Sequence, residues 1–287
     1  MKVQKIGILG AGTMGGGIAH LAAMKGLEVI LCDVEERFVE AARQRAAALM
    51  DKDIAKGKMT AEEKETVLGR LTTTTKIEDL SSADFVVEAI IEDLELKKNV
   101  FKKLDEICRP EVILATNTSS LSVTEIASAT SRPEKVAGMH FFNPPQVMRL
   151  VEVVCGYQTD EETVRRVMEL ARALDKTAVV CRKDTPGFIV NRILFAQFFE
   201  AIRMLEEGLA TPEEIDTAVT LGLNYPMGPF QLMDFGGLDL AVKIGEYFYS
   251  ETKDAKWNPP HSLKSLVRAG RVGRKAGAGW FTYEKKN

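Results

Sequence analysis

The first 183 residues alternate short apolar runs with longer stretches in which apolar residues recur at helical spacing. The apolar runs predict strands over residues 3–9, 28–32, 85–89, 112–116, 135–139, 150–154 and 178–181. Helical spacing predicts helices over residues 14–25, 35–56, 94–107 and 161–174. This alternation is typical of an α/β doubly wound fold, in which helices cover both faces of a mainly parallel sheet. The last two strands fit either parallel members of the sheet or antiparallel additions to it.

The pattern changes after Lys183, where Asp-Thr-Pro-Gly at 184–187 interrupts the chain. Helices are predicted over residues 188–208, 211–221, 230–249 and 262–269, and one further strand over 279–283. We therefore expect an α/β domain over residues 1–184 and an all-α domain over residues 185–287. The 188–208 helix carries more apolar side chains than one packing face needs, which favours burial in a homodimer, although packing wholly within the chain also fits.

Composition excludes several classes of function. Of the 287 residues, 45% are hydrophobic and 28% charged, with a net charge of −3, so the chain lacks the excess of basic residues that nucleic-acid binding needs. No apolar run approaches the ~20 residues of a membrane helix, and the first residues lead directly into a predicted strand rather than a signal peptide. The four cysteines are scattered without a C-x-x-C pair, which favours free thiols in the cytoplasm.

A glycine-rich motif follows the first predicted strand. Gly10, Gly12 and Gly15 fit the pattern G-x-G-x-x-G at the start of a helix. The first glycine permits a tight turn, the second lets the backbone approach a pyrophosphate, and the third lets the helix lie close to the strand. The helix N-terminus offers N–H groups and a partial positive charge to the phosphates. We therefore expect a Rossmann-like dinucleotide site that includes Gly10, Gly12, Thr13, Met14 and Gly15.

An acidic residue ends the second predicted strand. Asp33 lies 18 positions after Gly15, where a carboxylate can accept hydrogen bonds from both ribose hydroxyls of the adenosine. The same carboxylate repels a 2′-phosphate, so the site favours NAD over NADP. Arg37 lies close by in the sequence, and its positive charge would instead favour the 2′-phosphate of NADP.

One of the three histidines lies where a ligand would bind. We expect His20 to pack within the first helix, and we assign no role to His261, which follows two prolines. His140 comes after the 135–139 strand, and ligands of open α/β sheets bind beyond the carboxyl ends of the strands. The other residues expected at that edge are Gly10, Asp33, Glu92, Asn117 and Ser119.

A carboxylate in the next apolar strand can serve as partner to this histidine. Burial of Glu152 is costly unless it is paired, and pairing with His140 would orient the imidazole and raise its pKa toward working pH. Oxidation of an alcohol then needs a base for the proton, a nicotinamide for the hydride and no metal. Ser119 and Asn191 could hold the alcohol oxygen. Simple alternation along the strand would instead turn Glu152 to solvent. Ser119 and Asn191 could merely cap turns, as small polar residues often do.

With these residues in place, the chain closely resembles the 3-hydroxyacyl-CoA dehydrogenase family, in particular its bacterial 3-hydroxybutyryl-CoA members. The resemblance runs over residues 7–17, 88–101, 117–120, 138–145, 184–192, 225–230, 273–275 and 279–281. Its most specific part is His-Phe-Phe-Asn-Pro-Pro at 140–145 followed by Glu152. The chain departs from the commonest pattern at Ile-Ile-Glu-Asp over 90–93, which leaves Glu92 in place.

The resemblance implies a role for each matching position. It makes His140 the base and Glu152 its orienting carboxylate, with Ser119 and Asn191 on the substrate oxygen. It assigns Asp33 to the adenosine ribose. It places four residues at the nicotinamide end of the cofactor, namely Glu92, Lys97, Asn117 and Asn143.

Two lysines are implied to bind the other end of the substrate. Lys52 and Lys56 lie four positions apart, hence on one face of their predicted helix, and the resemblance implies that this face meets the phosphates of coenzyme A. A solvated lysine face fits the spacing equally well. The implied reaction converts (3S)-3-hydroxybutanoyl-CoA and NAD⁺ to acetoacetyl-CoA, NADH and a proton, as in fatty acid or butyrate metabolism.

Two other readings remain open. A related Rossmann dehydrogenase could act on another β-hydroxy acid, but such enzymes typically use a lysine base where this chain has His140 and Glu152. A non-catalytic NAD-binding protein, like the lens crystallins of this family, could keep the fold without the reaction. The presence of Ser119, His140, Glu152 and Asn191 together argues against that second alternative.

Overall fold

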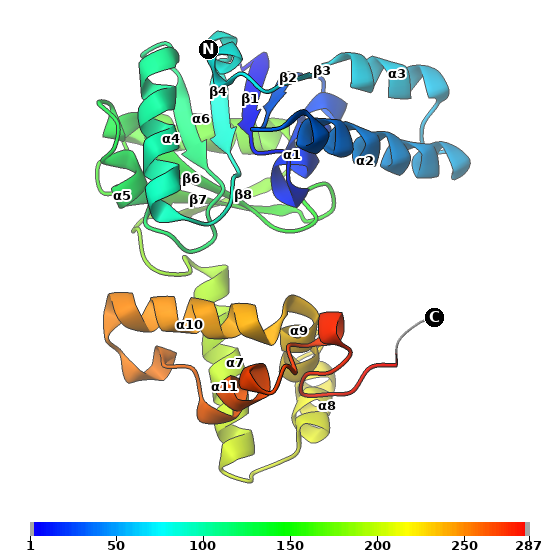
Figure 1. Ribbon diagram of the computed structural model, residues 1–287, viewed down its shortest axis with the longest axis vertical. Coiled ribbons are helices and arrows are strands. Elements are labelled where there is room, and N and C mark those ends of the chain that lie inside the picture. Colours follow the sequence, from blue (N-terminus) through cyan, green and yellow to red (C-terminus); the bar gives the residue numbers. More distant parts are fainter. Residues whose placement is uncertain (1–2, 285–287) are drawn as a thin grey trace. The chain divides into compact units, whose positions relative to one another are not determined.

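The computed structural model describes residues 3–284, and the chain divides into two compact units, 1–188 and 189–287. The first unit holds the sheet and the second is helical (Figure 1). Each unit has its own hydrophobic core. No helix in the described part of the chain is long and apolar enough to span a membrane.

The sheet of the first unit has eight strands in the order β3-β2-β1-β4-β5-β6-β7-β8. The strands are β1 (Lys5–Leu9), β2 (Glu28–Cys32), β3 (Leu71–Thr74), β4 (Phe85–Glu88), β5 (Ile113–Thr116), β6 (Val136–Phe141), β7 (Leu150–Cys155) and β8 (Thr177–Cys181). Strands β1 to β6 run parallel, whereas β7 is antiparallel to β6 and β8 is parallel to β7. The expected α/β sheet is confirmed, and its last two strands are antiparallel additions.

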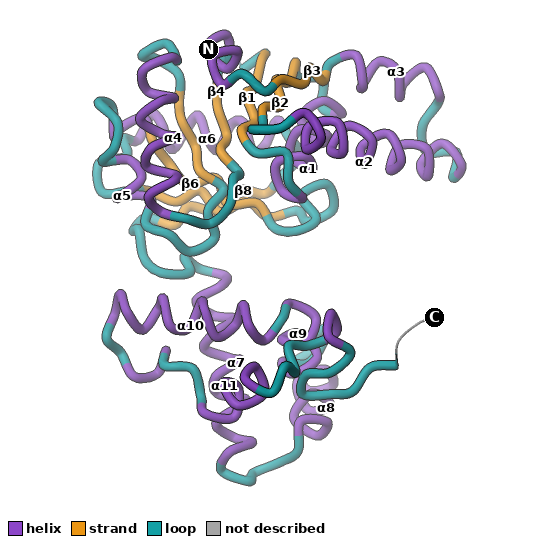
Figure 2. Tube along the Cα trace, in the orientation of Figure 1, coloured by secondary structure: helices purple, strands orange, loops and turns teal. Residues whose placement is uncertain are grey.

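Helices cover both faces of this sheet (Figure 2). They are α1 (Thr13–Met24), α2 (Glu36–Ala55), α3 (Ala61–Gly69), α4 (Leu94–Ile107), α5 (Val123–Ala127) and α6 (Glu161–Ala173). Successive residues of one strand enter opposite cores: Val29 and Leu31 belong to the core that includes residues of α1, α2 and α6, while Ile30 and Cys32 belong to the core that includes residues of α4 and α5. Burial on both faces explains why these strands are continuous apolar runs rather than alternating ones.

Strand β3 and helices α3 and α5 have no counterpart in the sequence prediction. Strand β3 reads Leu-Thr-Thr-Thr and lies at the sheet edge beside β2, so pairing rather than burial of an apolar run forms it. Helix α3 is held by a capping box between Thr60 and Glu63. Helix α5 has only five residues, too few to show a helical period.

Strand β6 is longer than expected. The prediction ended it at residue 139, with His140 beyond its end, but the strand continues to Phe141. His140 lies within β6 because the neighbouring β7 continues to pair with it, His140 opposite Glu152 and Phe141 opposite Val151. The expectation that His140 follows the strand is therefore wrong by two residues.

The second unit contains α7 (Val190–Glu206), α8 (Pro212–Gly222), α9 (Pro229–Gly236), α10 (Leu238–Thr252) and α11 (His261–Arg268). The single helix predicted over 230–249 is wrong, because Gly237 has φ +102° and separates α9 from α10. His261, to which no role was assigned, is the first residue of α11. The strand predicted over 279–283 is also wrong, since only isolated bridges join Ala278 to Gly273 and to Thr282.

Candidate active site

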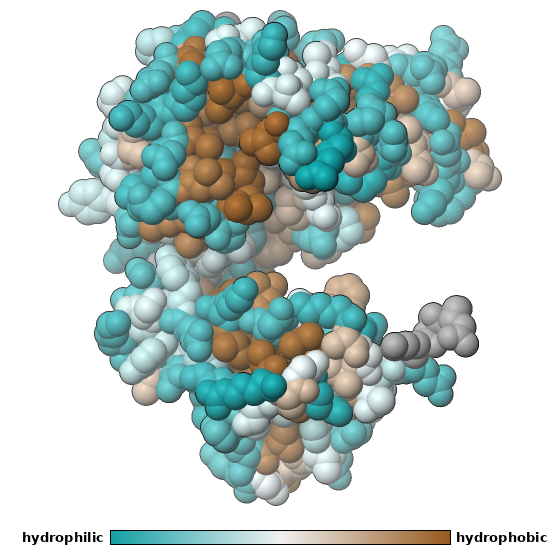
Figure 3. Space-filling view, viewed as in Figure 1, coloured by the Kyte–Doolittle hydropathy of each residue, from teal (hydrophilic) through white to brown (hydrophobic). Residues whose placement is uncertain are grey.

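The strand order of the sheet changes direction at β1. Strands β2 and β3 lie on one side of β1, and β4, β5 and β6 lie on the other. Ligands of such sheets bind beyond the carboxyl ends of the strands, where the connections diverge. On the visible face of the first unit, an apolar strip lies between α2 and α4 (Figure 3). The loops that follow β1, β2, β4, β5 and β6 all begin at the carboxyl edge of these parallel strands.

The glycine turn after β1 leaves room for a pyrophosphate. Gly10 has φ +103°, and a Cβ on Gly15 would lie 1.7 Å from the Gly10 carbonyl oxygen, so both positions require glycine. A Cβ on Gly12 would instead meet no atom within 4 Å, because this position faces open space. Helix α1 begins at Thr13, and no side chain caps it. Uncapped N–H groups next to open space are what a dinucleotide pyrophosphate requires.

Asp33, directly after β2, is tied to the glycine turn. Its Oδ2 accepts from the Ala11 N–H at 2.6 Å and its Oδ1 from the Val34 N–H at 2.7 Å. Arg45 of α2 holds the same turn by donating to the Ala11 carbonyl at 2.8 Å. A carboxylate offers about four lone-pair sites, so Asp33 can still accept from ribose hydroxyls. The sequence analysis expected a ribose contact for Asp33 but did not predict its contact with the turn.

His140 and Glu152 form a buried pair. They are directly opposite each other on β6 and β7, and His140 Nδ1 lies 2.8 Å from Glu152 Oε2. His140 is 5% exposed and Glu152 fully buried. Because a carboxylate only accepts hydrogen bonds, Nδ1 donates the hydrogen to Glu152, and a neutral imidazole in this orientation has its lone pair on Nε2. The pair therefore has the tautomer of a proton acceptor.

Two aromatic rings hold the imidazole from other directions. The Phe142 ring lies with its centroid 4.5 Å from that of His140, and the Phe188 ring lies edge-on at 5.8 Å. These contacts restrict rotation of the histidine and reduce its access to water. Asn117, at the end of β5, accepts from the Phe141 N–H at 2.9 Å through Oδ1 and so joins the ends of β5 and β6.

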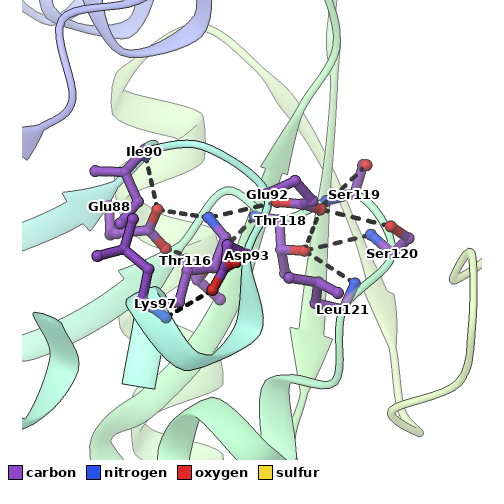
Figure 4. A network of polar contacts seen from close by, with 11 residues as sticks. Glu88, Ile90, Glu92, Asp93, Lys97, Thr116, Thr118, Ser119, Ser120 and Leu121 are labelled. Carbon is purple, nitrogen blue, oxygen red and sulfur yellow. Dashed lines mark hydrogen bonds and ion pairs between the residues drawn. The ribbon is translucent and has the colours of Figure 1, made fainter. Parts of the chain in front are cut away.

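Glu92 gathers the polar residues that follow β5 (Figure 4). Its Oε1 accepts from Thr118 Oγ1 at 2.6 Å and from the Ser119 N–H at 3.0 Å. The Ser119 hydroxyl lies 3.4 Å from the same oxygen. Lys97 Nζ lies 3.4 Å from Glu92 Oε2. The structure thus brings together Glu92, Lys97 and Ser119, which the sequence analysis assigned to one site.

Beneath this cluster lies an ion pair that sequence reasoning missed. Lys97 Nζ is 2.6 Å from Glu88 Oε1, and both side chains are almost fully buried. Glu88 also accepts from Thr116 Oγ1 and from the Ile90 N–H, each at 2.7 Å (Figure 4). The available signal was a glutamate that ends the otherwise apolar strand β4, because such a charge must be paired inside the protein.

The remaining predicted residues come from other elements of the fold. Asn143 lies in the loop after β6 and precedes the cis-proline Pro144. Lys52 is in the last turn of α2 and Lys56 is its C-cap, both exposed, and no hydrogen bond or ion pair within residues 3–284 joins them to the site. Asn191 is the second residue of α7 in the other unit. Across residues 3–284, no group of three or more His, Cys, Asp or Glu is placed to hold a metal ion.

Known proteins match the chain over its full length. The model of the 3-hydroxyacyl-CoA dehydrogenase NAD binding domain matches residues 5–185, and the C-terminal domain model of the same family matches residues 187–283. The chain is 46% identical to a probable 3-hydroxybutyryl-CoA dehydrogenase of Bacillus subtilis, over 100% of this chain and 99% of that protein. It is 44% identical to a 3-hydroxybutyryl-CoA dehydrogenase of Clostridioides difficile, over 98% and 100%.

Solved structures agree with the sequence matches. The crystal structure of (S)-3-hydroxybutyryl-CoA dehydrogenase from Ralstonia eutropha has a TM-score of 0.96 and 42% identity, and it covers 99% of this chain and 100% of that one. A structure from M. tuberculosis has a TM-score of 0.93 and 41% identity, with 99% and 100% covered.

Proposed function

The chain belongs to the 3-hydroxyacyl-CoA dehydrogenase family, and we propose that it interconverts (3S)-3-hydroxybutanoyl-CoA and acetoacetyl-CoA with NAD(H). The observation that carries the proposal is the buried contact of 2.8 Å between His140 Nδ1 and Glu152 Oε2 at the ligand-binding edge of the sheet. The names of the relatives, which describe dehydrogenases of 3-hydroxybutyryl-CoA, supply the substrate class.

Oxidation of the alcohol removes a proton from oxygen and a hydride from carbon 3. We assign the proton to His140 Nε2, which is free to accept it because Nδ1 donates to Glu152. The carboxylate then stabilises the imidazolium that forms. NAD⁺ supplies the hydride acceptor, and the carbon–oxygen bond becomes the ketone of acetoacetyl-CoA. In the reverse direction the same imidazolium returns the proton.

Other residues orient the reactants. We assign the Ser119 hydroxyl to the reacting oxygen of the substrate, since Glu92 holds its backbone N–H at 3.0 Å and so fixes its position. On the family resemblance we assign Asn191 to the same oxygen. Lys52 and Lys56, exposed at the end of α2, would bind the phosphates of coenzyme A.

The cofactor would lie along the loops of the sheet edge. The glycine turn with Thr13 and Met14 would hold the pyrophosphate, and Asp33 would accept from the adenosine ribose. The nicotinamide end would lie near four polar residues, Glu92, Lys97, Asn117 and Asn143. Lys97 is almost fully buried beneath Glu92, so its role would be to hold that carboxylate in place.

We extend the proposal to domains, assembly and compartment. The residues up to 184 would form the NAD-binding domain and residues 185–287 the substrate and dimerisation domain. Large apolar side chains exposed in the second unit, such as Ile193 at 63% and Phe235 at 66%, support a homodimer, which sedimentation equilibrium would test. The four cysteines are free thiols, which supports a reducing compartment such as the cytoplasm.

The function is tested by following NADH oxidation with acetoacetyl-CoA and with free acetoacetate. We expect turnover with the thioester and little with the free acid. The reverse preference would favour a dehydrogenase of another β-hydroxy acid. NADH binding without turnover of any 3-ketoacyl-CoA from C4 to C16 would favour a non-catalytic NAD-binding protein and overturn the proposal.

A further inference from the structure

The start of α2 holds an ion pair directly beside the expected ribose site. Arg37 Nε lies 2.8 Å from Glu35 Oε2, and its Nη2 donates to Glu35 Oε1 at 2.9 Å. The guanidinium carbon also lies 4.8 Å from the centroid of the Phe38 ring. The carboxylate therefore engages two of the three guanidinium nitrogens, and the aromatic ring lies against the group.

This arginine is four positions from Asp33, the residue expected to contact the 2′-hydroxyl. A guanidinium matches phosphate with the same two-pronged geometry that it uses for a carboxylate. The N-terminus of α2, which has no side-chain cap, also attracts phosphate. The segment thus contains two elements that would favour the 2′-phosphate of NADP.

Three carboxylates oppose those elements, namely Asp33, Glu35 and Glu36. The visible surface at the start of α2 is accordingly strongly hydrophilic (Figure 3). Glu36 has no interaction partner within the described residues, whereas Glu35 engages Arg37 directly. Repulsion of a phosphate is common to all three, but only Glu35 also occupies the guanidinium.

We infer that Glu35 determines cofactor specificity, because it holds Arg37 and denies that side chain to a 2′-phosphate. The inference rests on the proposed NAD site and adds a second residue to the discrimination that Asp33 provides. Both side chains are well exposed, at 50% for Glu35 and 71% for Arg37, so the effect is that of an exposed ion pair. Such a pair corresponds to a change in affinity of up to roughly fivefold.

The test compares Glu35→Gln with Glu36→Gln, two neighbouring substitutions that remove the same charge. The dissociation constants of NADH and NADPH are measured by titration of nicotinamide fluorescence, which needs no turnover. We expect Glu35→Gln to lower the dissociation constant of NADPH by roughly three- to fivefold, which is the scale of one exposed ion pair. The dissociation constant of NADH should stay within about twofold of the wild-type value. Glu36→Gln should change the dissociation constant of NADPH by less than about twofold.

Removal of the arginine completes the experiment. In the double variant Glu35→Gln, Arg37→Gln, the gain for NADPH should disappear. Equal gains in Glu35→Gln and Glu36→Gln, or a gain that persists without Arg37, would show a general field effect and overturn the inference. If wild type binds NADPH too weakly to titrate, the same set is compared in an Asp33→Asn background.

The outcomes separate this inference from the proposed function. Binding of NADH without reduction of acetoacetyl-CoA would remove the proposed reaction, while the fluorescence titrations would still decide the role of Glu35. A wild type that bound neither dinucleotide would overturn both.

Discussion

The buried pair of Lys97 and Glu88 allows a prediction of stability with a magnitude worked from its contacts. Removal of one partner of a buried pair leaves an uncompensated charge and costs about 3–5 kcal/mol. Lys97→Met leaves the Glu88 carboxylate with two hydrogen bonds, from Thr116 and Ile90, so we expect the lower end, about 3 kcal/mol. Glu88→Gln leaves Lys97 with Glu92 at 3.4 Å, so we expect about 4 kcal/mol.

The double variant separates the interaction from the separate effects of each substitution. The double variant Lys97→Met, Glu88→Gln leaves neither charge of the pair buried. We expect its loss in free energy of unfolding to be at least about 2 kcal/mol smaller than the sum of the two single losses. The matched control is Lys98→Met, which removes the neighbouring lysine and its exposed pair with Glu95 at 2.9 Å. That control should leave the urea unfolding midpoint nearly unchanged, because the pair that it removes is exposed.

The measurement is urea unfolding followed by far-ultraviolet circular dichroism and by tryptophan fluorescence. Both tryptophans, Trp257 and Trp280, lie in the second unit, so the fluorescence reports unfolding of that unit. A loss of stability that appears in the dichroism but not in the fluorescence therefore belongs to the first unit. Single variants that lose less than about 1 kcal/mol, or effects that add within about 0.5 kcal/mol, would refute the argument that the pair compensates two buried charges.

Three further predictions concern the catalytic pair, the cofactor and pH. His140→Gln should lower turnover by about 10²–10⁴-fold while NADH affinity stays within about twofold, and near-normal turnover would exclude His140 as the base. Asp33→Ala should weaken NADH more than NADPH in fluorescence titrations and loosen the turn at Ala11, and unchanged selectivity would contradict its ribose role. Burial lowers the pKa of His20 below 6.5, although Asp53 opposes the shift, so the unfolded chain binds the proton more readily and stability should fall as pH drops below 6.5. Urea unfolding of His20→Gln should lack that part of the decline, and an unchanged pH profile would contradict it.

Local signals in the sequence determined most of the sheet and the cofactor turn. Strands buried on both faces are mostly apolar, so β2 and β4 were visible as apolar runs that each include one terminal glutamate. The turn after β1 can form only with glycine at Gly10 and Gly15, because the first has φ +103° and the second has no room for a side chain. A lone histidine and a glutamate among aliphatic residues likewise indicated the pair of His140 and Glu152 before any distance was known.

Tertiary contacts decided the rest, because they depend on residues distant in the chain. Strand β3 carries three threonines and forms because β2 offers it unpaired backbone groups. The register of β7 keeps His140 inside β6 and opposite Glu152. The partner of Lys97 is decided by the packing of α4 against the sheet, which brings Lys97 to Glu88. A pattern of polar and apolar positions shows that a buried charge needs a partner. It does not show which side chain the fold brings within reach of that charge.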